Sequence, residues 1–169
     1  MNRVEEYRNL ARANSRARFI ELCPYPFLLG MPQLSRPHQP GRTILVSQQD
    51  REALLSTPRK RRPSSETTLI VLPVRKVQEA FASMITVGRT SNNDVVIEDV
   101  QVSKFHAFFR ISGDQLELAD AGSRNGTFIG KLRLEAKGAA RPVRAGETVR
   151  FGHLEFVFVD AGPCWDRLR

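Results

Sequence analysis

The chain has 169 residues, a hydrophobic content of 41% and a formal net charge of +8, a size that excludes a large multidomain enzyme. No stretch approaches the roughly 18 apolar residues that a membrane span needs. A domain of this size buries roughly two thirds of the surface of its unfolded chain, so folding requires no disulfide framework or structural metal. Cys23 and Cys164 form no Cys-x-x-Cys motif and are expected to be reduced thiols. The first twenty residues carry charged side chains where a signal peptide would have an apolar core. We therefore expect a cytoplasmic protein, or a nuclear one in a eukaryote.

The positive charge is concentrated in the first half of the chain. Residues 1–80 contain 14 Lys/Arg and 7 Asp/Glu, a net charge of +7, whereas residues 81–169 contain 12 and 11, a net charge of +1. Eight of the ten prolines lie at or before Pro73, and nine of the eleven glycines lie at or after Gly88. The chain therefore consists of two regions that are built differently.

The first region, residues 1–66, is predicted to be an N-terminal extension that begins with a helix. From about Asn2 to Leu22 the apolar residues recur at three- and four-residue spacing, which predicts one amphipathic helix ended by Pro24. Residues 24–42 are rich in proline and are expected to be irregular.

Shorter elements are predicted in the rest of the extension. The apolar run at residues 43–46 predicts an edge strand, and Ser47 followed by Asp50 predicts a capped helix over residues 47–55. Residues 57–66 are expected to form a linker, because they combine proline and serine with four consecutive basic residues.

The second region, residues 67–161, is predicted to be an all-β sandwich, and residues 162–169 a C-terminal tail. Short apolar runs rich in β-branched and aromatic residues alternate with Gly, Asn, Asp and Ser at intervals of about ten residues. The expected strands are 68–76, 84–88, 94–97, 106–112, 115–119, 127–129, 142–144, 148–151 and 154–159.

Three polar clusters lie at the expected strand ends: Gly88-Arg89-Thr90, Ser103-Lys104-Phe105-His106, and Ser123-Arg124-Asn125-Gly126-Thr127. The loops of a sandwich gather at its two ends, so residues from separate loops can form one site. A guanidinium and a hydroxyl are suitable donors for phosphate oxygens, and an amide can bond to a peptide backbone. The clusters therefore indicate binding of an oxyanion that is attached to a peptide.

The order and spacing of these clusters closely resemble the forkhead-associated (FHA) domain, a phosphothreonine-peptide-binding β-sandwich. The resembling motifs are Gly-Arg at 88–89, Ser-x-x-His at 103–106 and Asn-Gly-Thr at 125–127, with the flanks SNNDVVI, VSKFHA and DAGSRNGTF. The resemblance covers about residues 67–161. It implies a sandwich of two antiparallel sheets that recognises phosphorylated peptides.

The resemblance also implies a role for each residue of the binding site. Arg89 and Ser103 are expected to bind the phosphate, and Asn125 the backbone of the bound peptide. Lys104 is expected to be a second phosphate donor, and Arg124 to contact phosphate or peptide.

Four further motif residues are implied to be structural. His106 is expected to brace the loops without acid–base chemistry, and Gly88, Gly126 and Thr127 to shape the backbone. The sequence departs from the family at Gly130, where the family usually has a second Asn.

The implied partner is a phosphothreonine-containing protein that a Ser/Thr kinase has modified. No catalytic activity, cofactor or metal is expected. Gln101 and Val102, which precede Ser103, are neutral, so we expect no strong demand for an acidic residue three positions after the phosphothreonine.

Other interpretations of the same residues were weighed. Ser103 and His106 could form a nucleophile–base pair, but no nucleophile elbow or orienting acid is recognisable. Five acidic residues lack the spacing of a calcium loop and are expected to have turn or surface roles: Asp94, Glu98, Asp99, Asp114 and Asp120. Seven aromatic residues are expected to lie mostly in the core: Phe105, Phe108, Phe109, Phe128, Phe151, Phe156 and Phe158.

Two hypotheses concern the basic first half. Nucleic acid is the alternative partner, with the basic half binding phosphate backbone while the FHA-like domain recruits another protein. The segment Glu66-Thr67-Thr68 resembles a short motif that small bacterial FHA regulators carry and have phosphorylated, so phosphorylation and self-binding of Thr67 or Thr68 is a second hypothesis.

Overall fold

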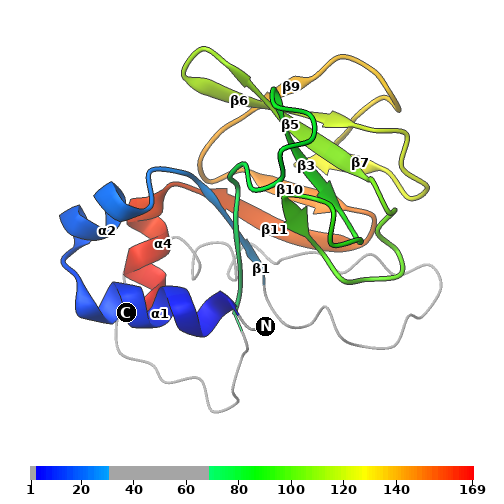
Figure 1. The fold of residues 1–169 in the computed structure, drawn as a ribbon. Helices are drawn as coiled ribbons and strands as arrows, with labels where there is room; N and C mark the ends of the chain where they lie inside the picture. Colours follow the sequence, from blue (N-terminus) through cyan, green and yellow to red (C-terminus); the bar gives the residue numbers. More distant parts are fainter. Residues whose placement is uncertain (1–2, 31–68) are drawn as a thin grey trace.

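The computed structural model describes residues 3–30 and 69–169 and consists of a β-sandwich with a layer of helices against one sheet (Figure 1). Three helices are described: α1 (Arg3–Ala13), α2 (Arg16–Leu22) and α4 (Ala161–Leu168). Figure 1 shows them together beside β1 and β11, away from the far end of the sandwich at β6 and β9. None of the helices in these two ranges is long and apolar enough to cross a membrane.

The first sheet has six strands in the order β2-β1-β11-β10-β7-β8. Each pair of neighbouring strands in this sheet is antiparallel. The strands are β1 (Phe27–Gly30), β2 (Ile70–Pro73), β7 (Thr127–Ile129), β8 (Leu132–Arg133), β10 (Thr148–Phe151) and β11 (Leu154–Val159).

The second sheet has five strands in the order β4-β3-β5-β6-β9. Only the pairing of β3 with β4 is parallel within this sheet. The strands are β3 (Met84–Gly88), β4 (Val95–Val96), β5 (Ala107–Ser112), β6 (Gln115–Asp120) and β9 (Arg141–Val143). The predicted all-β sandwich of two sheets is confirmed.

Strand β1 differs from the sequence-based expectation. We expected residues 24–42 to be irregular and the sandwich to begin at residue 67, yet Phe27–Gly30 pairs with both β11 and β2 in the middle of a sheet. The sandwich therefore includes a strand from the segment that was assigned to an extension. The sequence pattern missed this strand because the apolar run is only four residues long and lies in a segment whose prolines predict irregular structure.

The core between the two sheets contains inward-facing residues of both. Four of the seven aromatic residues expected there are fully or almost fully buried: Phe109, Phe151, Phe156 and Phe158. The other three lie outside the core, because Phe105 is exposed and Phe108 and Phe128 are only half-buried.

A second apolar core joins the helices to the outer face of the six-stranded sheet. Phe27 and Leu29 of β1 pack into it, whereas Leu28 between them belongs to the sandwich core, as the alternation of a strand requires. Trp165 of α4 is buried in the second core, and its indole N–H donates to the carbonyl oxygens of Ala11 at 3.1 Å and Asn14 at 3.2 Å. Strand β1 thus contributes to both cores and joins the helical layer to the sandwich.

The helices also differ from expectation in two places. The single helix predicted to end before Pro24 is interrupted, because Ser15 caps a new helix by accepting from the Arg18 N–H at 3.3 Å. The expected C-terminal tail is instead α4, with Asp160 at its N-cap position. The strand expected at 43–46, the helix at 47–55 and the linker at 57–66 lie outside the described residues, as do Thr67 and Thr68.

Candidate functional site

Three loops converge at one end of the sandwich. Strand β5 runs antiparallel to β3 and β6, and Ala107 at its start lies opposite Val87 near the end of β3 and Asp120 at the end of β6. The loop after β3, the loop before β5 and the loop after β6 therefore leave the sheet together. Each of them carries one of the polar clusters singled out in the sequence.

Ser103 is hydrogen-bonded to both neighbouring loops. Its carbonyl oxygen accepts from the Arg89 backbone N–H at 3.0 Å, and its side-chain oxygen accepts from the Arg124 backbone N–H at 3.1 Å. Because the hydroxyl oxygen is the acceptor in the second bond, its own hydrogen stays available to another group. The structure thus brings Ser103, Arg89 and Arg124 together.

Three cationic residues, Arg89, Lys104 and Arg124, belong to the loops that meet at this serine. Arg89 is half-buried, and Lys104 and Arg124 are exposed. Within residues 3–30 and 69–169 none of the three is in an ion pair with a carboxylate. Unneutralised cations beside a free hydroxyl donor form a suitable site for an anion.

Asn125 is oriented by Gln101 from the preceding loop. Its side-chain N–H₂ donates to the Gln101 carbonyl oxygen at 2.7 Å and to the Gln101 side-chain oxygen at 2.9 Å. Both bonds use the amide nitrogen, so the amide oxygen of Asn125 can accept from another backbone N–H. Gln101 was noted in the sequence only as a neutral residue, and its positioning role was missed.

His106 braces the loops from inside the fold, where it is completely buried. Its Nδ1 accepts from the Ser103 backbone N–H at 3.0 Å, so Nε2 carries the hydrogen and donates to the Gly126 carbonyl oxygen at 3.1 Å. Burial lowers the pKa of His106, against opposing effects of the Gly126 bond and of Asp120. The histidine is therefore neutral, and it holds the backbone of Ser103, not its hydroxyl, which argues against a nucleophile–base pair.

Gly88 allows the first two loops to meet. A Cβ at this position would collide with the carbonyl oxygen of Lys104 and lie 2.7 Å from the side-chain nitrogen of Asn93. The same Lys104 oxygen accepts from Asn93 Nδ2 at 2.7 Å and from Thr90 Oγ1 at 3.0 Å. Asn93 lies in the SNND flank of the first motif, but its role was not identified from the sequence.

Asp120 organises the third loop. Its carboxylate accepts from the backbone N–H groups of Gly122 at 2.8 Å and Ser123 at 2.9 Å, and from the hydroxyl of Thr127 at 2.6 Å. Burial raises the pKa of Asp120, but these bonds and one from the Ser123 hydroxyl together lower it. Gly126 follows with a φ of 84°, a conformation that favours glycine.

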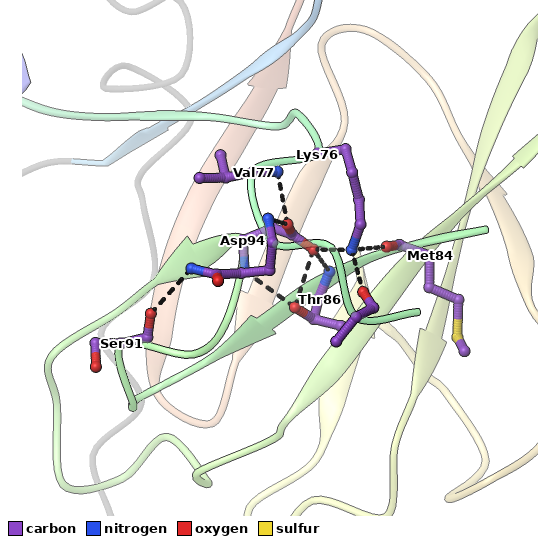
Figure 2. Close-up of polar contacts among 8 residues, drawn as sticks. Lys76, Val77, Met84, Thr86, Ser91 and Asp94 are labelled. Atoms are coloured by element: carbon purple, nitrogen blue, oxygen red, sulfur yellow. Dashed lines mark hydrogen bonds and ion pairs between the residues drawn. The ribbon is translucent and has the colours of Figure 1, made fainter. Parts of the chain in front are cut away.

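A second buried carboxylate, Asp94, fixes the loop between β2 and β3 (Figure 2). It accepts from Lys76 Nζ at 2.9 Å and from the backbone N–H groups of Val77 at 2.7 Å and Thr86 at 2.8 Å. Burial raises the pKa of Asp94, but these hydrogen bonds and the one from the Gln78 N–H lower it to about 2.

The acidic residues thus only partly follow expectation. Asp120 has the expected turn role although its side chain is buried, whereas Asp94 is buried and fixes a loop from inside the fold. Glu98 and Asp114 are exposed and Asp99 is half-buried. No group of metal-ligating side chains occurs in the part of the chain that the structure describes.

Comparison with known families matches residues 85–152 to the family model described as the FHA domain. The "Oxoglutarate dehydrogenase inhibitor" of Corynebacterium glutamicum is 37% identical over 79 residues, which cover 47% of this chain and 52% of that protein. The "Glycogen accumulation regulator GarA" of Mycolicibacterium smegmatis is 34% identical over 79 residues, 47% of each protein. The chain therefore spans about half the length of the curated relatives it matches.

Solved structures of similar fold include Mycobacterium tuberculosis EmbR in complex with a low-affinity phosphopeptide. It is 17% identical, with a TM-score of 0.47, covering 85% of this chain and 29% of that one. An FHA domain from Chlamydia trachomatis is 20% identical, with a TM-score of 0.46, covering 80% and 97% of the two chains.

Proposed function

The chain contains an FHA domain, and from this premise we propose that it binds phosphothreonine peptides of a partner protein in Ser/Thr-kinase signalling. The observation that carries the proposal is the environment of Ser103. Its hydroxyl oxygen accepts from the Arg124 N–H, which leaves the hydroxyl hydrogen to donate. The loops that meet at it carry three cationic residues, none of which is in an ion pair with a carboxylate within residues 3–30 and 69–169. A phosphate dianion has the charge and the acceptor oxygens that such a site requires.

Each residue of the site has a role in this proposal. Arg89 and Ser103 bind the phosphate, Lys104 adds a second cation, and Arg124 contacts phosphate or the adjoining peptide. Asn125 accepts a hydrogen bond from a backbone N–H of the peptide through its amide oxygen, because its amide nitrogen is bonded to Gln101. Recognition then depends on a few placed donors and does not require a general positive field.

Regulation without catalysis is the second part of the proposal. The two relatives described above are named as an inhibitor and a regulator, and His106 is committed to two structural hydrogen bonds. The chain would act in the cytoplasm, downstream of the kinase that modifies its partner. The nucleic-acid alternative gains no support from these relatives.

A phosphopeptide array tests the proposal. Each sequence on the array is present with phosphothreonine, phosphoserine, phosphotyrosine and unmodified threonine, and is probed with wild type and with Arg89→Ala. We expect wild type to bind phosphothreonine spots and Arg89→Ala to lose them while keeping the wild-type circular dichroism spectrum.

Arg144→Ala is the matched control for loss of one positive charge. Arg144 is exposed and precedes β10, whereas the binding loops lie at the opposite end of that strand, where Gly152 approaches Asn125. We expect Arg144→Ala to bind as wild type does. Equal binding by wild type and Arg89→Ala, or no phosphate-dependent binding at all, would show that the proposal is wrong.

A further inference from the structure

Three phenylalanine rings form a row on the surface next to the proposed phosphate site. The ring centroids of Phe81 and Phe105 lie 6.3 Å apart with nearly parallel planes, and those of Phe105 and Phe108 also lie 6.3 Å apart. Phe81 is 60% exposed and Phe105 is 41% exposed. We name Phe81, Phe105 and Phe108 the aromatic stripe. Large apolar side chains rarely lie together in contact with water unless the surface binds something.

Phe81 is held in this position by its backbone. Its φ of 57° is a left-handed conformation that bulky side chains rarely adopt, so the surrounding structure must impose it. Its carbonyl oxygen accepts from the Met84 N–H at 2.8 Å, and the carbonyl oxygen of Ala80 accepts from Lys76 Nζ at 2.6 Å. The two peptide groups on either side of Phe81 are thus both hydrogen-bonded.

The buried carboxylate of Asp94 extends this support to the sheet (Figure 2). Lys76 bonds Asp94 as well as Ala80, and Asp94 in turn bonds the backbone of Thr86 in β3. The loop that presents Phe81 is therefore anchored to a strand whose end carries Arg89. The loop that carries the exposed Phe81 ring is thus held in place by hydrogen bonds that lead to a buried carboxylate.

The stripe is continuous with the phosphate site. Phe105 directly follows Lys104, whose carbonyl oxygen is held by Asn93 and Thr90, and it directly precedes the buried His106. Phe105 is therefore the member of the stripe that is nearest in sequence to the proposed phosphate donors Ser103 and Lys104. We expect side chains close to the phosphothreonine of a bound peptide to reach it.

We propose that the aromatic stripe binds an apolar side chain of the same phosphorylated segment that occupies the phosphate site. The inference rests on the proposed function and deepens it, because it names the class of ligand: phosphothreonine segments with an aliphatic or aromatic residue close to the phosphothreonine. Phosphate contacts supply most of the affinity, and the stripe selects among phosphorylated sequences.

A second copy of this chain is a less suitable occupant. A stable dimer buries about 800 Å² on each partner, whereas a phenylalanine buries at most about 150–250 Å². One of the three rings is half-buried, and the other two lose part of their exposed surface to stacking. The exposed area of the stripe is therefore smaller than a stable dimer interface needs. One or two peptide side chains match that area.

The test uses a degenerate peptide library in which only the phosphothreonine is fixed. We expect wild type to enrich Leu, Ile, Met or Phe at one or two positions near the phosphothreonine. The enriched peptide and its version with alanine at that position are then titrated by calorimetry. Removing one partly buried aliphatic contact is expected to weaken binding roughly tenfold.

Phe81→Asn is the variant of choice, because asparagine tolerates a left-handed conformation and removes the ring without new strain. Ile111→Asn is the control: Ile111 is 65% exposed on the same strand as Phe108, but strand alternation directs it to the other face. We expect Phe81→Asn to bind both peptides equally and about tenfold more weakly than wild type binds the enriched one. Ile111→Asn should keep the wild-type preference.

The outcomes separate the two proposals. If wild type binds no phosphopeptide, the proposed function fails and the inference fails with it. If wild type binds phosphopeptides without apolar enrichment, or if Phe81→Asn keeps the preference, the inference alone is overturned. Sedimentation that shows a wild-type dimer lost in Phe81→Asn would assign the stripe to a second copy and overturn it as well.

Discussion

The backbone N–H of Arg124 donates to the side-chain oxygen of Ser103 at 3.1 Å, although the two residues are 21 positions apart in the sequence. This bond orients the serine hydroxyl, because the oxygen is used on the protein side and the hydrogen is directed elsewhere. It also brings the Arg124 side chain to the same loop as Lys104. The geometry of the anion site thus depends on loop-to-loop bonds as much as on the charged residues themselves.

Gly88→Ala tests the contact between the first two loops. The new Cβ would collide with the Lys104 carbonyl oxygen, which is backbone and cannot move without shifting Ser103. We expect phosphopeptide affinity to fall at least tenfold and the free energy of unfolding to fall by about 1–3 kcal/mol, the range for overpacking. Titration calorimetry and urea denaturation measure the two effects.

Gly113→Ala is the control for a glycine substitution, because no atom lies within 4 Å of a Cβ built at Gly113. It lies in the turn between β5 and β6 with a φ of 60°, so it should cost some stability and leave peptide affinity unchanged. Wild-type affinity in Gly88→Ala would contradict the role given to Gly88.

His106 should make stability depend on pH near neutrality. Its pKa is lowered from 6.5 by burial, so below about pH 6.5 the unfolded chain takes up a proton that the native histidine does not. Stability is therefore fully present above pH 6.5 and falls as the pH is lowered. We expect urea midpoints to decline from pH 7.5 to 5.5 in wild type and to change less in His106→Gln. An unchanged decline in His106→Gln would mean that another group causes it.

Asp94 should contribute to stability only while it is ionised. Its pKa is about 2 in the native chain against 3.8 in the unfolded one, a difference that corresponds to about 2 kcal/mol. The contribution is complete above pH 3.8 and is lost as the pH falls through about 2. Asp94→Asn should therefore be clearly less stable than wild type at pH 5, and the gap should narrow toward pH 2. A gap that stays constant between these pH values would contradict the ionised assignment.

Trp165 tests whether the helical layer and the sandwich unfold together. Trp165→Ala removes a buried ring and two hydrogen bonds to the end of α1. We expect a loss of about 3–5 kcal/mol in the free energy of unfolding. Because β1 contributes residues to both cores, the sheets should unfold at a lower urea concentration than in wild type. Far-ultraviolet circular dichroism of the sheets measures this shift. If the sheets unfold at the wild-type urea concentration, the layers are independent.

Much of the sandwich could be predicted from the sequence. Short runs of β-branched and aromatic residues bounded by turn residues are recognisable, and β3, β7, β10 and β11 have the bounds that this pattern predicts. Strand β1 could not be found in this way, because it is only four residues long in a proline-rich segment and its pairing with β11 joins residues far apart in the sequence. Helix α4 was missed because Gly162 and Pro163 disfavour a helix locally, and packing of Trp165 overrides them.

The charged residues of the candidate site are visible in the sequence, but their supports are not. Arg89, Ser103 and Asn125 lie in recognisable motifs. Asn93 and Gln101 act through bonds to backbone oxygens or side chains 11 and 24 residues away, and spacing alone does not reveal such contacts. The burial of Asp94 and its link to Phe81 likewise depend on the tertiary fold.

The most direct test of the account is calorimetric titration of one phosphothreonine peptide selected from the array, using wild type, Arg89→Ala and Arg144→Ala. We expect Arg89→Ala to lose about 2–5 kcal/mol of binding free energy, the range for truncating one partner of a buried charge pair, and Arg144→Ala to match wild type. The unphosphorylated peptide should not bind to any of the three proteins. Wild-type affinity in Arg89→Ala, or equal affinity for the two peptides, would contradict the account.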